Sequence, residues 1–94
     1  MSKKLWTFVR TERFVDQFRE FDGRDKRLEQ FMLIIEWALA HNPRMGKQTA
    51  TADIWAINSR YLRYDVTVYY SFNDHQIILE GVMLEESPDS PADE

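Results

Sequence analysis

The hydrophobic period of this chain changes near Asp53, and that change limits the folds open to it. Between Thr11 and Asn42, large apolar side chains recur every three or four residues, as on one face of an α-helix. From Asp53 onward, apolar and aromatic residues alternate with polar ones, as in strands with one buried face. We therefore predict an α+β fold in which helices and a sheet share one core.

The segment before the change predicts an N-terminal strand and then a helix. Leu5 to Val9 alternates like a short strand with one buried face. Thr11 is a suitable N-cap for a helix that ends at Asp22-Gly23. Phe14, Phe18 and Phe21 form one apolar stripe along this helix, which predicts the face that meets the core.

A second predicted helix completes an antiparallel helix hairpin. Its N-cap is Asp22 or Asp25, and it ends at His41-Asn42-Pro43, where Asn tolerates a left-handed cap and Pro cannot continue a helix. One face carries Leu28, Phe31, Met32, Ile35 and Leu39. Ile34, Trp37 and Ala38 widen that face, so we expect this helix to be buried on more than one side.

Three strands follow, and they predict a three-stranded antiparallel meander. The strands run over Asp53–Asn58, Leu62–Phe72 and Gln76–Leu84. Asn73-Asp74 predicts a tight hairpin between the last two, since both residues accept positive φ. In the middle strand, one face belongs on the helices and carries Tyr64, Val66, Val68, Tyr70 and Phe72. The other face carries Arg63, Asp65, Thr67, Tyr69 and Ser71.

Charge is distributed unevenly along the chain, whose net charge is −4. Residues 1–84 carry 12 basic and 11 acidic side chains, a net charge of +1, and five acidic residues lie within residues 85–94. The body is nearly neutral, unlike most domains that bind nucleic acid backbones. We predict one domain over residues 1–84 and a disordered acidic tail over residues 85–94.

The sequence lacks the patterns of several classes of protein and of binding site. The chain has no cysteine and no apolar run near the roughly 20 residues of a membrane span, which predicts a soluble, cytoplasmic protein without membrane contact. His41 and His75 lack a ligand-spaced carboxylate cluster, and the three glycines are isolated. We therefore predict no metal site, no phosphate-binding glycine loop and no cofactor.

Two local sequences resemble the RelE/ParE family of bacterial toxins. The first, directly after the second helix, is similar to the family's frequent Asn-Pro-x-x-Gly turn: Asn42-Pro43-Arg44-Met45-Gly46-Lys47. The second is similar to the family's core strand and final hairpin: Val66-Thr67-Val68-Tyr69-Tyr70-Ser71-Phe72, then Asn73-Asp74, then Gln76-Ile77-Ile78-Leu79-Glu80-Gly81-Val82. The order of elements also matches that of the family, over about residues 5–84.

The resemblance implies the toxin half of a bacterial toxin–antitoxin pair, with an antitoxin protein wrapped around the domain. Some members of the family cleave messenger RNA in the ribosome, and others inhibit DNA gyrase. Cleaving members use a core-strand arginine and basic, Tyr or His residues near the final strand. Here Thr67 best matches that arginine, and the final strand ends Leu84-Glu85-Glu86.

These departures leave two alternatives open. One is a ribosome-dependent mRNA endoribonuclease with a reduced set of catalytic groups. The other is a non-catalytic protein-binding module, such as a gyrase-inhibitor type of toxin or a detoxified homologue. The candidate catalytic residues are Lys47, Arg60, Arg63 and Tyr69.

Each candidate also has a plain structural interpretation. Tyr69 is expected beside Thr67 on the open sheet face, where its hydroxyl donates a hydrogen bond in a chemical role or its ring only packs. Arg63, four residues before Thr67 on the same face, contacts a phosphate or pairs with Asp65 or Glu80. We expect Arg60 and Tyr61 in the loop between two strands, either at a partner or in solvent. Lys47, after the Asn-Pro turn, is either similar to a basic loop residue of the cleaving members or a lone surface lysine.

Overall fold

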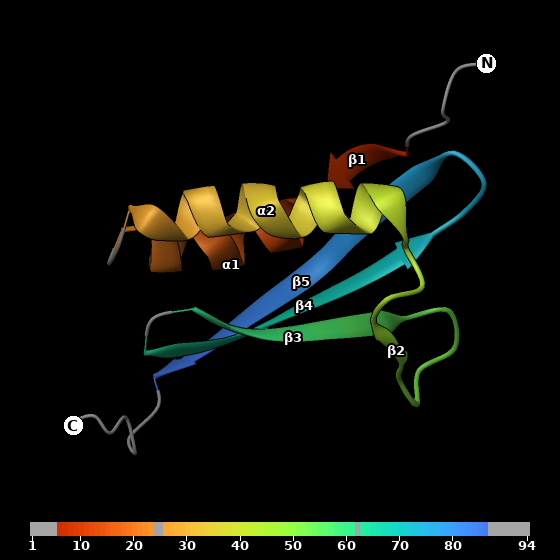
Figure 1. Cartoon of the computed structure of the whole chain (residues 1–94). Coiled ribbons are helices and arrows are strands. Elements are labelled where there is room, and N and C mark those ends of the chain that lie inside the picture. The colour runs from red at the N-terminus through yellow and green to blue at the C-terminus, as the bar shows by residue number, and fades with distance from the viewer. Residues whose placement is uncertain (1–5, 24–25, 62, 87–94) are drawn as a thin grey trace.

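The structure is a computed structural model that describes residues 6–23, 26–61 and 63–86. Within this part of the chain, two helices lie on one side of a mixed five-stranded sheet, an α+β fold (Figure 1). In chain order the elements are β1 (Thr7–Arg10), α1 (Glu12–Asp22), α2 (Arg27–His41), β2 (Lys47–Gln48), β3 (Trp55–Tyr61), β4 (Tyr64–Phe72) and β5 (Gln76–Glu86).

The strand order across the sheet is β1-β5-β4-β3-β2. The antiparallel meander of β3, β4 and β5 is confirmed. β1 pairs in parallel with the first half of β5, from Thr7 opposite Gln76 to Arg10 opposite Leu79. β2 was not predicted, and it adds two residues to the outer edge of β3. The first and last strands in the chain are thus neighbours, and β3 lies toward the opposite edge.

Several strand boundaries differ from those predicted. β3 ends at Tyr61 rather than Asn58, because it remains paired with β4 up to the turn. β5 continues past Leu84 to Glu86, which lies opposite Tyr64. Glu85 and Glu86 therefore belong to the sheet and not to a tail. The rest of the predicted tail, residues 87–94, lies outside the described residues, as do Leu5 and Leu62.

The core lies between the two helices and the sheet. Alternation in β4 holds as predicted, because Val66, Val68 and Tyr70 are buried on the helix side. Phe14 and Phe18 of α1 are buried as well, and Phe21 packs against them at the margin. The buried residues form one cluster: Phe14, Phe18, Leu28, Phe31, Met32, Ile35, Leu39, Val66, Val68, Tyr70, Ile77, Leu79 and Val82.

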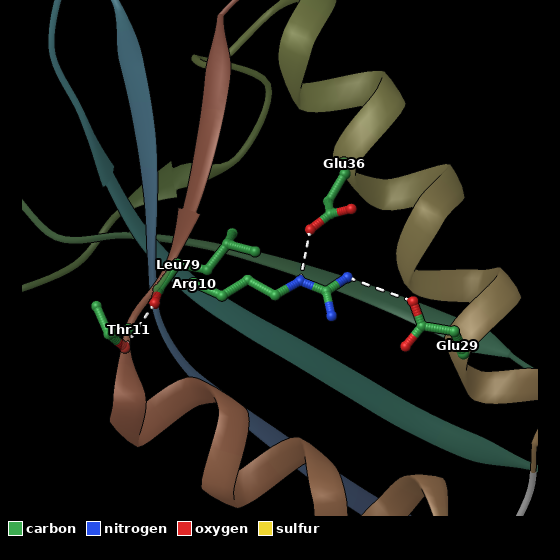
Figure 2. Close-up of polar contacts among 5 residues, drawn as sticks. All are labelled: Arg10, Thr11, Glu29, Glu36 and Leu79. Carbon is green, nitrogen blue, oxygen red and sulfur yellow. Dashed lines mark hydrogen bonds and ion pairs between the residues drawn. The ribbon is translucent and has the colours of Figure 1, made fainter.

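Thr11 begins α1 as predicted and also joins it to the sheet. Its Oγ1 accepts a hydrogen bond from the backbone N–H of Phe14 at 3.1 Å, a side-chain N-cap. The same hydroxyl donates to the carbonyl of Leu79 at 2.8 Å, and the Thr11 N–H donates to that carbonyl at 3.2 Å. Figure 2 shows this contact at the point where β1 turns into α1. The start of the helix is therefore held to β5.

Arg10, the residue before this cap, ties β1 to α2. Its Nε donates to Glu36 at 2.9 Å and its Nη2 to Glu29 at 3.5 Å, so the guanidinium lies between two carboxylates of α2 (Figure 2). The guanidinium also lies over the rings of Phe14 and Phe18. Burial by itself lowers the pKa of Arg10, but its hydrogen bonds and attraction to the two carboxylates raise it above its ordinary value.

The ends of α2 differ from the predicted caps. Its N-cap is Lys26, without a capping side-chain hydrogen bond, while Asp22 is the last residue of α1 and Asp25 lies outside the described residues. Asn42 is the C-cap, but its φ of −155° is extended rather than left-handed. The Asn42 Oδ1 instead accepts the N–H of Arg44 at 3.2 Å. Asn42 therefore starts the following turn by a side-chain contact.

The outer face of α2 is exposed, so the prediction that this helix is buried on more than one side was wrong. Leu33, Ile34 and Trp37 are 54%, 60% and 66% exposed. One side of α2 packs on the core. The opposite side is exposed because, among the described residues, no further layer lies above the helices (Figure 1). Apolar residues at neighbouring helical positions predict a wide apolar face, but not whether the protein itself covers it.

The hairpin between β4 and β5 is present, but its turn is built by a side chain. Oδ1 of Asn73 accepts the N–H groups of His75 and Gln76, both at 2.8 Å. Neither Asn73 nor Asp74 has a positive φ, which among the described non-glycine residues occurs at Asp53. The expected positive φ was therefore wrong. An Asn side chain that accepts from the residues ahead of it closes such a turn without that conformation.

Candidate functional site on the open sheet face

The sheet face opposite the helices, called the open face below, carries most of the predicted site. No helix among the described residues covers it (Figure 1). Cross-strand partners share a face, so the register defines its members. From β2 to β5 these include Lys47, Ala56, Asn58, Arg60, Asp65, Thr67, Tyr69, Ser71, Glu80, Met83 and Glu85.

A hollow of about 460 Å³ opens beside Tyr69, between the open face and α1. Arg13 is its basic lining residue and Glu80 its acidic one. It is lined by Arg13, Gln17, Thr51, Ile54, Tyr69, Glu80, Gly81, Val82 and Met83. The hollow therefore brings one of the four predicted site residues, Tyr69, together with a cation and a carboxylate that the sequence did not single out.

A β-bulge in β5 shapes one wall of the hollow. Tyr69 pairs with Gly81 and Tyr70 with Leu79, so Glu80 is an extra residue between two ladder positions. The bulge reverses the facing of the residues that follow. Ile77 and Leu79 face the core before it, and Val82 and Leu84 do so after it, although the spacing between Leu79 and Val82 is odd. One strand can therefore contribute to the core on both sides of Glu80.

Gln17 of α1 satisfies a backbone group at this bulge. The N–H of Val82 points away from β4, and it donates to Oε1 of Gln17 at 2.8 Å. Gly81 leaves room for this contact, because a Cβ added there would lie 3.0 Å from the same oxygen and the Gln17 side chain would have to shift. Arg13 precedes Gln17 by one helical turn and shares its side of α1. The bulge and the helix thus place Arg13 at the rim of the hollow.

The carboxylate of Glu80 is held in place on the open face. Oγ of Ser71 donates to Oε2 of Glu80 at 2.8 Å, from β4 to β5. Ser71 bonds only to Oε2, so its hydroxyl does not occupy Oε1 of Glu80. A carboxylate held at one oxygen can still accept a proton or a hydrogen bond at the other.

Lys47 and Tyr69 lie in one row across three strands. Lys47 is opposite Ala56 in β3, and Ala56 is opposite Tyr69 in β4. The two backbones are therefore two strand spacings apart, about 10 Å. Only the methyl group of Ala56 stands between their side chains in this row. The register thus brings Lys47 and Tyr69 to one part of the open face.

Arg60 and Tyr61 were predicted in a loop, but both belong to β3. Arg60 is on the open face opposite Asp65, four residues along β3 from Ala56, or about 13 Å. Tyr61 faces the helices, where its ring stacks on Phe31 with centroids 4.7 Å apart. Tyr61 is therefore a packing residue, and Arg60 lies at the far end of the open face from the hollow.

Arg63 lies in the turn between β3 and β4, and not on the strand as predicted, because β4 begins at Tyr64. Its Nη1 pairs with Oε2 of Glu86 at 3.5 Å, and both side chains are mostly exposed. The predicted partners, Asp65 and Glu80, were therefore wrong. Thr67, near the middle of β4, accepts a hydrogen bond from Nδ2 of Asn58 at 2.8 Å.

The Asn-Pro-x-x-Gly turn is fastened to the core by Tyr70. This fully buried tyrosine donates its hydroxyl to the carbonyl of Pro43 at 2.6 Å and accepts the N–H of Gly46 at 3.2 Å. A Cβ added at Gly46 would lie 2.6 Å from both the Tyr70 hydroxyl and the carbonyl of Ala56, so only glycine fits. Burial raises the pKa of Tyr70, partly offset by the N–H of Gly46.

Sequence reasoning missed Arg13, Gln17 and Glu80 as site residues. The isolated Gly81 in an alternating strand was an available signal, since such a glycine often marks a bulge. The spacing of Arg13 and Gln17 by one helical turn was a second signal. Neither shows that the polar side of α1 meets the edge of β5, which depends on the parallel pairing of β1 with β5.

The histidines and carboxylates of the described residues form no group of three that could hold a metal ion. Nδ1 of His41 lies 2.8 Å from the carbonyl of Trp37, at the C-terminus of α2. His75 is exposed in the hairpin turn. No helix within the described residues is long and apolar enough to cross a membrane.

Comparison of the chain with family models, with curated proteins and with solved structures finds no match.

Proposed function

We propose that this protein is a RelE/ParE-like toxin of a bacterial toxin–antitoxin pair and that it acts on RNA through its open face. The observation that carries the proposal is the meeting of Arg13, Tyr69 and Glu80 around one hollow, with Lys47 in the row of Tyr69. The Asn-Pro-x-x-Gly turn and the final hairpin, through which the chain resembles that family, add support.

These side chains suit cleavage of RNA by its own 2′-hydroxyl. In that reaction the 2′-oxygen attacks phosphorus, a base takes its proton, and the 5′-oxygen leaves with a proton from an acid. Glu80 is the carboxylate that accepts a proton, and the Tyr69 hydroxyl is the donor. Arg13 and Lys47 offset the charge of the phosphorane. Arg60 and Arg63 lie farther along the sheet, where they meet flanking phosphates rather than the reacting one.

Expression of the chain in a bacterium tests this proposal. We expect growth arrest and cleavage of ribosome-bound messenger RNA, both reduced by Tyr69→Phe and by Arg13→Gln. Removal of one group that acts in the transition state should slow cleavage at least about tenfold. Arg19→Gln is the matched control, because Arg19 is an exposed arginine of the same helix that pairs with Asp16 at 3.8 Å, outside the hollow. Intact message in the presence of folded protein rules out the ribonuclease.

A second candidate function is favoured by the outer face of α2. Leu33, Ile34 and Trp37 expose three large apolar side chains at neighbouring positions on that helix. Such a group often marks a protein-binding surface. The alternative is therefore a non-cleaving toxin that works by binding a protein such as DNA gyrase, or a detoxified homologue that retains only its antitoxin.

The product of the neighbouring reading frame tests the toxin–antitoxin pairing, and assays of message cleavage and of gyrase activity then separate the two candidates. A small protein with a DNA-binding part and an unstructured segment, in a stable complex with this chain, is expected for either kind of toxin. If this complex forms, messenger RNA stays intact and the chain inhibits DNA supercoiling in an assay with purified gyrase, the second candidate is favoured. Trp37→Glu should then weaken the complex between this chain and its small partner protein, whereas Tyr69→Phe should leave that complex unchanged.

A further inference from the structure

The outer edge of β3 is only partly covered. β2 covers this edge only opposite Trp55 and Ala56, while β3 continues to Tyr61. On the other side, all seven residues of β3 are paired with β4. No described strand lies along the outer edge beyond Ala56.

The hydrogen bonds at the start of β3 define which backbone groups face outward. The N–H of Thr49 donates to the carbonyl of Ile54 at 2.9 Å, so Ile54 points toward β2. In a strand, every second residue directs its N–H and C=O to the same side. The backbone N–H and C=O groups of Ala56, Asn58 and Arg60 therefore face the outer edge, and those of Asn58 and Arg60 have no partner in β2. These two N–H groups and two carbonyls are spaced so that an added strand could pair with them.

β2 begins at Lys47, directly after the Asn-Pro-x-x-Gly turn. The N–H of Gly46 donates to the buried hydroxyl of Tyr70, and the described pairing of β2 with β3 does not extend to residues before Lys47. Beside the edge this leaves a hollow of about 400 Å³, lined by Met45, Gly46, Lys47, Ala56, Ile57 and Asn58. The hollow therefore adjoins the outward-facing backbone of Asn58.

The two sides of this edge differ in chemistry. On the open face, Lys47 and Arg60 flank Asn58, and the nearest carboxylate, Asp65, is one strand farther in. On the helix side, Ile57 faces the core, and the exposed Met45 shares the hollow with it. A strand added here would thus place alternate side chains beside two cations and beside apolar surface.

We propose that the edge of β3 from Asn58 to Arg60 binds an extended segment of a partner protein in which acidic and apolar residues alternate. The segment adds a strand to the sheet through the backbone groups of Asn58 and Arg60. Its acidic residues face Lys47 and Arg60, and its apolar residues face Met45 and Ile57. This site needs no catalysis on the open face, so it stands whether or not the protein cleaves RNA.

Hydrogen exchange with a synthetic peptide tests the site. The probe is a seven-residue peptide of alternating Glu and Val with blocked ends. On binding, exchange of the Asn58 and Arg60 amides should slow, while the Ile57 and Ser59 amides, already bonded to β4, should not change. The same peptide with N-methyl groups on alternate residues, or with Lys in place of Glu, should bind at least about tenfold more weakly. Unchanged exchange at both amides with saturating peptide overturns the proposal.

Two substitutions at one position provide a matched pair. Asn58→Pro removes an outward N–H without loss of a ladder hydrogen bond, and we expect peptide binding at least about tenfold weaker. Asn58→Ala keeps that N–H and loses the same contact with Thr67, and should bind within about twofold of the parent. Equal binding by the two variants refutes the edge as the site. Slower exchange of both amides with rising protein concentration alone, without peptide, would assign the edge to a second copy of this chain and refute the partner segment.

Discussion

Replacement of Tyr70 by Phe removes one oxygen atom from the centre of the molecule. The hydroxyl donates to the carbonyl of Pro43 and accepts from the N–H of Gly46, and the tyrosine is fully buried. A buried polar group left without its partner costs about 1–3 kcal/mol. Pro43 is buried, whereas Gly46 is partly exposed and can bond to water. We therefore expect a loss of about 2–3 kcal/mol in the free energy of unfolding.

Urea denaturation followed by circular dichroism measures this loss, with an m-value unchanged because the same surface is exposed on unfolding. For a domain of this size, each kcal/mol lowers the Tm by about 4–8 °C. Tyr69→Phe is the matched control, since its hydroxyl lies at the open face, and it should cost less than about 0.5 kcal/mol. Equal losses for the two variants would refute the assignment of Tyr70 as the anchor of the Asn-Pro-x-x-Gly turn.

Three further predictions concern the Arg10 ion pairs, Gly46 and the titration of Tyr70. Glu36→Ala should destabilise the fold by about 1–2 kcal/mol in urea, because the half-buried Arg10 loses its closest carboxylate. Glu29→Gln should cost less than about 0.5 kcal/mol, because its contact with Arg10 is longer and more exposed. Gly46→Ala should lower the Tm by more than about 5 °C, since its Cβ meets two oxygens at 2.6 Å and backbone must move. The raised pKa of Tyr70 means that the fold is more stable when this tyrosine is protonated. Its contribution to the free energy of unfolding should be complete below pH 10.0 and should be lost as the pH rises through the folded-state pKa. In urea denaturation at alkaline pH, Tyr70→Phe should lack this loss.

Local patterns were sufficient for most of the secondary structure. The cap at Thr11, the phenylalanine stripe of α1 and the alternation of β4 each depend on neighbours within one turn or one strand. Because these preferences depend mainly on residues close in the sequence, the sequence alone can predict them. Boundaries were less accurate, because β3 and β5 extend as far as their partner strands support them.

The candidate site was predicted only in part. Tyr69 was placed on the open face, and the register adds Lys47 to its row through Ala56. Arg63 was expected on β4 and lies in a turn with Glu86 instead. β4 begins at Tyr64 rather than Leu62, and this difference of two residues leaves Arg63 in the turn, where the alternation of faces along a strand does not apply.

By itself, the sequence determined the kinds of elements, their order and the residues that β4 turns toward the helices, because hydrophobic period and capping chemistry act over a few residues. The tertiary structure alone decided that β1 lies beside β5, that Glu80 forms a bulge, and that Arg13 from α1 reaches the hollow beside Tyr69. It also decided that one side of α2 stays exposed. These features depend on which distant segments share the core, and a local pattern does not specify its partner.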